Sequence, residues 1–211
     1  MNDIHNKLVS YFSNKEKPII LDVGSYLMED ANAFAHVFPN GKVYAFECDP
    51  RNIEQIKLRR GNAPNTELIE VAISNTNGET EFWQSQKINF NSPYFLSGSM
   101  RKPTGHLSEY PVSFSSSPIK IPCITLDSWY NFNLKEFPIE LVWCDVNGGE
   151  REFLEGAVET LKNTHLLWIE CFNKEMYDGE VNCEWVSKFV ENLGFKYVWE
   201  FGHNNLYQRK I

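Results

Sequence analysis

The chain has 211 residues, of which 42% are hydrophobic and 14% aromatic, and its formal net charge is −8. This length suits one domain, residues 1–211, with a sizeable core. The negative charge argues against a nucleic-acid backbone as the main partner, and no apolar run is long enough to cross a membrane.

The cysteines are five in number, and they show no metal-ligand spacing. Cys48, Cys123, Cys144 and Cys171 lie in strand-like runs. We expect buried, reduced thiols without a disulfide framework. Because residues 1–10 also lack the apolar core of a signal peptide, we expect a cytoplasmic protein.

The first predicted elements form a recognisable unit. Residues 2–13 have one apolar helical face, and residues 18–25 are typical of a fully buried parallel strand that enters a tight turn at Gly24. Apolar residues then recur at helical spacing from Met28 to Phe38. A second buried strand, 42–46, ends on Glu47. This order predicts a nucleotide-binding half-unit, in which the glycine lets the backbone approach the ligand and the acid binds ribose hydroxyls.

The turn at Gly24 favours S-adenosyl-L-methionine (SAM) over a dinucleotide as the ligand. The second and third glycines that seat a pyrophosphate are missing, since Tyr26, Leu27 and Met28 follow Gly24 and Ser25. A nicotinamide-dependent oxidoreductase is disfavoured for the same reason.

The rest of the chain continues the alternation of strands and helices. Asp49 and Pro50 suit the N-cap and the first position of a helix. Residues 84–118 are rich in Ser, Asn and Pro and lack sustained periodicity, which indicates a substrate loop or lid. The further predicted strands are 67–73, 79–83, 120–126, 138–146, 165–170, 195–199 and 205–208, and the further predicted helices are 50–57, 150–161 and 185–193.

This order predicts an α/β protein with a mainly parallel sheet, helices on both faces and a C-terminal antiparallel hairpin. Ligands of such sheets bind outside the carboxyl ends of the strands, at the switch point. Asp22, Glu47, Asp145 and Glu170 all lie at or next to predicted strand ends. We therefore expect these acids to gather around one crevice.

Five sequence blocks, read in order, resemble the FkbM-like family of SAM-dependent methyltransferases over roughly residues 18–172. The blocks are Leu21-Asp22-Val23-Gly24-Ser25, Ala45-Phe46-Glu47-Cys48-Asp49-Pro50, Thr125-Leu126-Asp127, Cys144-Asp145-Val146-Asn147-Gly148-Gly149-Glu150 with Leu154-Glu155-Gly156-Ala157, and Trp168-Ile169-Glu170. The resemblance implies a Rossmann-like seven-stranded methyltransferase sheet, SAM as donor and transfer to an oxygen of a sugar or secondary metabolite. Two positions depart from the family pattern: Asn147 replaces a Glu, and Met28 replaces a second glycine.

The candidate site residues follow from these blocks. Asp145 is expected to face both the methyl group and the acceptor, as a base or as an orienting carboxylate, although bonding to the Gly148 and Gly149 amides is an equally simple alternative. His106 in the loop is a second candidate base, against the alternative of a solvated loop residue. The expected cofactor-binding set is Asp22, Gly24, Ser25, Glu47, Cys48, Ala72 and Asp145. We expect no metal.

Two functional hypotheses stand at this point. The first is a SAM-dependent methyltransferase acting on a sugar, glycan or small-metabolite hydroxyl, with a homodimer left open. The second is a catalytically silent binding protein of the same fold, because Met28 would crowd the methionine end of the cofactor.

Overall fold

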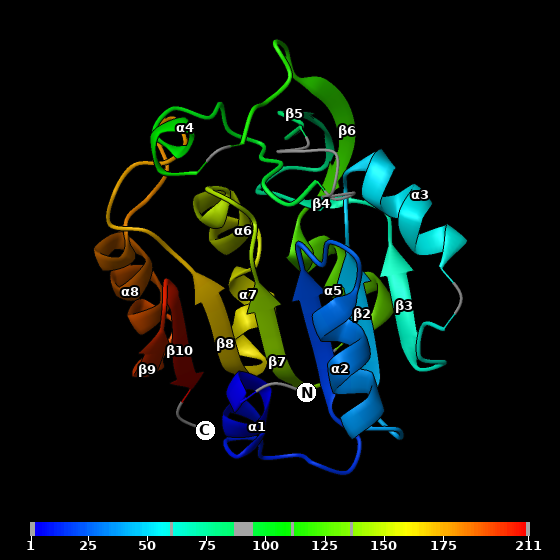
Figure 1. Ribbon diagram of the computed structural model, residues 1–211. Coiled ribbons are helices and arrows are strands. Elements are labelled where there is room, and N and C mark those ends of the chain that lie inside the picture. The colour runs from blue at the N-terminus through cyan, green and yellow to red at the C-terminus, as the bar shows by residue number, and fades with distance from the viewer. Residues whose placement is uncertain (1–2, 60, 87–94, 111, 136, 210–211) are drawn as a thin grey trace.

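The computed structural model describes residues 3–59, 61–86, 95–110, 112–135 and 137–209. Its main sheet has seven strands in the order β3-β2-β1-β7-β8-β10-β9 (Figure 1). The strands are β1 (Ile19–Val23), β2 (Lys42–Phe46), β3 (Thr66–Ile69), β7 (Ile139–Cys144), β8 (Thr164–Glu170), β9 (Phe195–Phe201) and β10 (Asn204–Arg209). The first five in spatial order are parallel, whereas β10 runs antiparallel to both β8 and β9. The predicted mainly parallel sheet and its C-terminal hairpin are confirmed.

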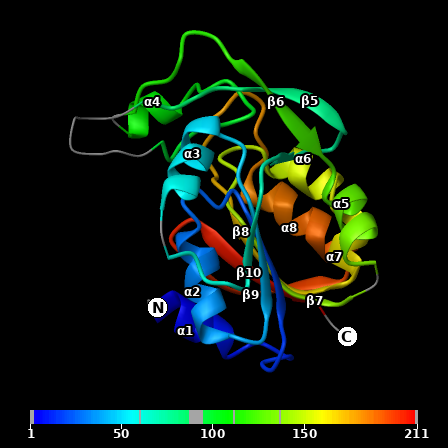
Figure 2. The same ribbon diagram turned by 90° about the vertical axis from the view of Figure 1, so that its right-hand side faces the viewer.

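Helices cover both faces of this sheet because successive strand residues point to opposite sides. Ile20 packs in one core cluster and its neighbour Leu21 in another. Figure 2 shows the two helical layers edge-on. The first layer holds α1 (Asp3–Val9), α2 (Glu29–Val37) and α3 (Pro50–Leu58), and the second holds α5 (Leu126–Asn133), α6 (Glu150–Glu155), α7 (Val158–Lys162) and α8 (Cys183–Asn192). Among the described residues, no helix has the length and apolar character that a bilayer crossing requires.

A second, three-stranded sheet lies over the carboxyl ends of the main strands (Figure 1). It consists of β4 (Ala72–Ile73), β5 (Gly78–Phe82) and β6 (Ile119–Ile124) in the order β4-β6-β5, and a short α4 (His106–Glu109) lies nearby. The predicted strand 67–73 is therefore two strands in two sheets. The chain leaves β3 at a tight turn, where the Val71 amide donates to the Ile69 carbonyl at 3.0 Å.

Helix α3 begins where the sequence provides an N-cap residue. The Asp49 carboxylate accepts a hydrogen bond from the Arg51 amide at 3.0 Å, as predicted for an N-cap. The predicted helix 150–161 is interrupted at Gly156, where an added Cβ would lie 2.0 Å from the Ser74 carbonyl oxygen. Contact with a distant loop thus divides α6 from α7.

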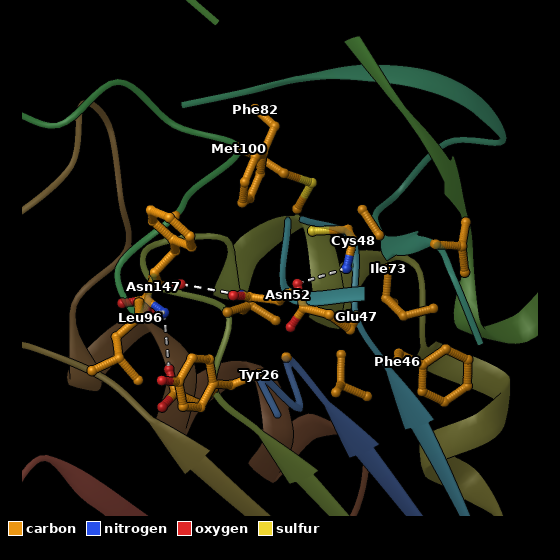
Figure 3. A pocket seen from close by; sticks show the side chains of 18 residues that line it. Tyr26, Phe46, Glu47, Cys48, Asn52, Ile73, Phe82, Leu96, Met100 and Asn147 are labelled. Atoms are coloured by element: carbon orange, nitrogen blue, oxygen red, sulfur yellow. Dashed lines mark hydrogen bonds between the residues drawn. The ribbon is translucent and has the colours of Figure 1, made fainter. Parts of the chain in front are cut away.

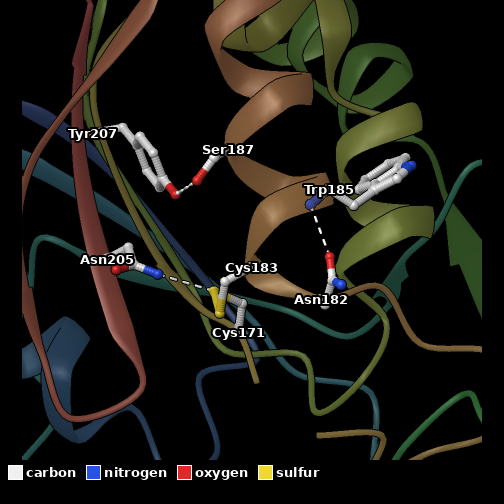
Figure 4. Close-up of a disulfide and its surroundings, with 7 residues drawn as sticks. All are labelled: Cys171, Asn182, Cys183, Trp185, Ser187, Asn205 and Tyr207. Carbon is white, nitrogen blue, oxygen red and sulfur yellow. Dashed lines mark hydrogen bonds between the residues drawn. A yellow bond between two sulfur atoms is a disulfide. The ribbon is translucent and has the colours of Figure 1, made fainter. Parts of the chain in front are cut away.

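The expectation that the cysteines lack a disulfide is wrong for one pair. Cys171, after β8, is bonded to Cys183, the first residue of α8, with a Cα–Cα distance of 5.3 Å (Figure 4). The bond closes the 172–182 segment into a loop. Cys48, Cys123 and Cys144 are free thiols. The disulfide removes the cysteine-based reason to assign a reducing compartment.

Candidate active site

The turn after β1 explains why a glycine is needed at position 24. Gly24 has a φ of +81°, and an added Cβ would lie 1.8 Å from the Asp145 carbonyl oxygen. The backbones of β1 and β7 meet here, since the Asp145 amide donates to the Val23 carbonyl at 2.9 Å. The glycine is therefore required by contact between protein segments as well as by any ligand.

Met28 lies in the core, away from the open edge. Its side chain is 1% exposed and packs with residues of α1 and α2 and of the sheet. Met28 and Tyr26 both adopt left-handed backbone conformations, with φ values of 61° and 53°. Because the Met28 side chain does not line the hollow described next, the structure gives no support to a crowded methionine site.

A hollow of about 550 Å³, including its open mouth, lies outside the ends of β1, β2 and β7 (Figure 3). Of the expected cofactor-binding residues, those that line the hollow are Gly24, Glu47, Cys48, Ala72 and Asp145. Asp22 and Ser25 are buried and do not line it.

Glu47 is held rigidly at the end of β2. Its Oε1 accepts hydrogen bonds from the Cys48 amide at 2.9 Å and the Asp49 amide at 2.7 Å. Burial raises the pKa of Glu47 to about 7, although these backbone bonds favour the ionised form. The structure thus places a fixed acidic acceptor on the wall of the hollow.

Asp22 and Ser25 carry polar atoms that lack partners. Asp22 is 1% exposed, and neither its Oδ2 nor the Ser25 Oγ has a hydrogen-bond partner among the described residues. Burial, and then the negative charge of Asp30, raises the pKa of Asp22 well above its usual range. Buried polar atoms without partners are rare in folded proteins, and they indicate a ligand or bound water at this turn.

The Asp145 carboxylate does not cap the two glycine amides of the turn that follows it. The Gly148 amide donates to Glu150 Oε1 at 3.0 Å, and the Gly149 amide donates to the Val146 carbonyl at 3.2 Å. The alternative in which Asp145 caps these two amides is therefore wrong. Its carboxylate instead accepts a 3.3 Å hydrogen bond from the side chain of Asn147 and faces the hollow.

Asn147 suits its position because its φ is 49°, a left-handed conformation that Asn tolerates better than most residues. It also joins the turn to the loop above. Its side-chain amide donates to the Leu96 carbonyl at 3.3 Å, and its own carbonyl accepts from Ser99 Oγ at 2.6 Å. The departure from the family pattern thus lies where the turn meets the loop.

The charge of the hollow has one sign. Among the described residues that line it, Glu47 and Asp145 are acidic and none is Lys, Arg or His. Asp22, whose Oδ2 lacks a partner among the described residues, is a third acid nearby. Such a site suits a ligand with positive charge and disfavours the pyrophosphate of a dinucleotide.

The described parts of the predicted loop, residues 84–86, 95–110 and 112–118, cover this edge. Arg101 forms a 2.5 Å ion pair with Glu152 of α6, so it anchors the loop to the body of the protein. The Thr104 and His106 amides both donate to the Met176 carbonyl, at 3.0 and 3.1 Å. The loop is therefore fastened to the 172–182 segment. The part of it at 87–94 lies outside the described residues.

His106 is in this covering layer and does not line the hollow. Its ring is 5% exposed and lies 5.4 Å, centroid to centroid, from the ring of Tyr177. The Tyr177 hydroxyl in turn lies 3.5 Å from the Asn147 side-chain oxygen. Burial lowers the pKa of His106. His106 as a base stays a prediction, and the structure brings Asp145 closer to the hollow.

Several lining residues had no signal in the sequence. They come from segments far apart in the chain, and only the tertiary structure brings them together: Tyr26, Phe82, Phe95, Leu96 and Met100. Asn52 is different, because it is a polar residue on the buried side of α3. Its side-chain amide donates to the Phe95 carbonyl at 3.1 Å. A polar residue on a predicted buried helix face was the available clue.

The fold is that of SAM-dependent methyltransferases. Solved structures with this fold include an rRNA methylase from Streptococcus thermophilus, with a TM-score of 0.53, 15% identity and coverage of 98% of this chain and 93% of that chain. Another is magnesium protoporphyrin IX methyltransferase (ChlM) from Synechocystis PCC 6803 with bound SAM, with a TM-score of 0.52, 12% identity and coverage of 98% and 76%. At these identities the likeness concerns the fold alone.

The family is shown by sequence. The model of the methyltransferase FkbM domain matches residues 22–197. The 2-O-methyltransferase NoeI of Sinorhizobium fredii is 35% identical over 178 residues, which are 84% of this chain and 72% of that protein. The chain belongs to the FkbM methyltransferase family, and the resemblance seen in its sequence blocks is confirmed.

Proposed function

We propose that this protein uses SAM to methylate a hydroxyl oxygen of a sugar, a glycan or another small metabolite. The acidic hollow beside the unpartnered Oδ2 atom of Asp22 carries the proposal, because bound SAM supplies a methyl group on a positively charged sulfur and also carries an ammonium group. The residues present fit that molecule. Glu47 and Asp145 lie on the hollow wall, and no described lining residue is basic.

Each residue has a role in this proposal. Glu47 accepts hydrogen bonds from the ribose hydroxyls, and the apolar side chains of Ala72 and Ile73 flank the base. Asp22 Oδ2 and Ser25 Oγ form hydrogen bonds, directly or through water, with the ammonium and carboxylate groups of the methionine part of SAM. Asp145 removes or orients the acceptor proton.

The proposed class of methyl acceptor is based on the relative NoeI and on the net charge of this chain. NoeI is a 2-O-methyltransferase by name, which favours a hydroxyl acceptor. The net charge of −8 disfavours a nucleic-acid acceptor, whose phosphates would be repelled. No observation on the described residues favours the catalytically silent alternative, since the Met28 side chain is in the core.

Calorimetric titration of the ligand-free protein with S-adenosylhomocysteine tests the cofactor. We expect binding by the wild type and a roughly 10- to 100-fold weaker affinity in Glu47→Ala, because a hydrogen bond to a charged group is lost. Glu54→Gln, an exposed acid on α3, is the matched control and should bind like the wild type. No heat at millimolar ligand with folded protein would end the proposal.

A further inference from the structure

A second carboxyl group stands beside Asp145 at the end of the next strand. The register of the parallel pair β7 and β8 matches Trp143 with Trp168 and Cys144 with Ile169. The next residues in that register are Asp145 and Glu170. Two adjacent parallel strands therefore present their terminal acids to the same open edge, side by side.

Matched positions on adjacent parallel strands point to the same face of the sheet, so the two carboxyl groups lie within reach of each other. Each group also shifts the pKa of the other, as a hydrogen bond between them would. A bond between two carboxyl oxygens requires a proton on one of them, so the pair carries a single negative charge while the bond exists. Both residues are partly buried. Glu170 is also matched in register with Asn204 of the antiparallel strand β10. The structure thus holds the two acids together by backbone register on both sides of Glu170.

The surroundings decide which acid holds the proton. Burial raises the pKa of both groups, and the hydrogen bond lowers the pKa of Asp145 while it raises that of Glu170. The other titratable groups that interact with the pair are acids, a phenol and a thiol: Asp30 of α2, Asp22 of β1, Cys144 of β7, Glu150 of α6, and Glu180 and Tyr177 of the 172–182 segment. Arg101, which interacts with Glu180, is engaged by Glu152. The Asp145 carboxylate also accepts a hydrogen bond from the side-chain amide of Asn147, which favours its ionised form, so the proton belongs on Glu170.

We infer that Glu170 is a positioning residue: its protonated carboxyl donates a hydrogen bond to Asp145 and holds that carboxylate ionised and turned toward the acceptor. The inference rests on the proposed O-methylation. When the acceptor hydroxyl loses its proton, a carboxylate oxygen of Asp145 takes it, and the pair passes from one proton and one negative charge to two protons and no charge. The electron pair of the broken O–H bond stays on the acceptor oxygen.

Carboxyl-¹³C NMR titration of the ligand-free protein tests the inference without cofactor or acceptor. The Asp145 and Glu170 signals are assigned with Asp145→Asn and Glu170→Gln. At neutral pH we expect Glu170 protonated and Asp145 ionised. Glu170→Gln keeps a donor, so the pKa of Asp145 should stay unchanged, whereas Glu170→Met keeps the volume without the donor and should raise it.

Kinetics supply the second readout. Glu170→Met should lose about 10- to 100-fold in kcat, the value of a hydrogen bond to a charged group, with little change in the KM for SAM. Glu170→Gln, which keeps a hydrogen-bond donor, should retain most of the wild-type kcat. Glu184→Gln, an exposed acid at the start of α8, is the matched control and should resemble the wild type.

The inference is overturned if both carboxyl groups are ionised at neutral pH, if Glu170→Gln lowers the pKa of Asp145, or if Glu170→Met leaves it unchanged. The wild-type and Glu170→Gln titrations suffice should Glu170→Met not fold. Failure of S-adenosylhomocysteine to bind would overturn the proposed function and leave the titration result standing, so the two failures are distinguishable.

Discussion

At Met28, backbone strain and side-chain burial act in opposite directions. A left-handed conformation costs a non-glycine residue roughly 1–2 kcal/mol, and Met28 has a φ of 61°. The buried thioether side chain offsets that cost by packing between α2 and the sheet. The family glycine and this methionine are thus two solutions to one turn, and the methionine solution leaves the hollow open.

We expect Met28→Gly to destabilise the protein by roughly 1–4 kcal/mol, because the lost packing of a buried side chain exceeds the relief of backbone strain. The affinity for S-adenosylhomocysteine should stay within about twofold of the wild type, since the side chain does not line the hollow. Urea unfolding and calorimetry measure the two quantities. Met28→Leu keeps the volume and should change neither by much. A tenfold gain in affinity for Met28→Gly would contradict the core placement.

At the scale of elements, the 172–182 segment links the disulfide to the active-site cover. Cys171 and Cys183 hold its two ends. Between them, the Met176 carbonyl accepts hydrogen bonds from two backbone amides of the covering loop. The Tyr177 hydroxyl donates a hydrogen bond to the Ser97 carbonyl at 3.2 Å. The disulfide therefore restrains the segment on which the cover rests.

Reduction of this disulfide should lower the free energy of unfolding by about 3 kcal/mol, the value for closure of a loop of this size. Urea unfolding with and without a dithiol reductant measures the difference. The reductant should have no effect on the Cys171→Ala/Cys183→Ala double variant, which serves as the control. Equal stability of the wild type in both conditions would show that the bond does not stabilise the fold.

For the whole molecule, buried acids at one edge make stability depend on pH. Burial raises the pKa of Glu47 to about 7 and that of Glu150 to about 8. Both values lie above those of the unfolded chain, so the folded state binds more protons than the unfolded state in this range. Stability is then greatest at the acidic side and falls as the pH rises.

Between about pH 6.5 and about pH 8, we expect the free energy of unfolding to fall by up to about 1.4 kcal/mol per pH unit for each extra proton that the folded state holds. His106, whose pKa burial lowers, opposes this trend only at more acidic pH. Denaturant unfolding at several pH values gives the slope. Glu47→Gln and Glu150→Gln should flatten it, whereas Glu54→Gln should not. A slope of the opposite sign would show that these acids are ionised without cost in the folded state.

Local patterns predicted the strands and helices that depend on short stretches of chain. The run 42–46 is β2 to the residue, and Asp49 with Pro50 starts α3. The same rules missed α5, although Thr125 caps it by accepting a hydrogen bond from the Ser128 amide at 3.1 Å. They also merged β3 with β4 and α6 with α7, because those divisions arise from contacts between distant segments.

The sequence by itself determined the class of fold and the order of its acids, because alternating buried strands and amphipathic helices impose a parallel sheet whose strand ends meet at one edge. It could not determine the second sheet, the Cys171–Cys183 bond or the side chains that close the hollow from the covering loop. Nor could it show that Asp145 is free of the Gly148 and Gly149 amides and paired with Glu170. Those features depend on distances between residues far apart in the chain, which only tertiary packing decides.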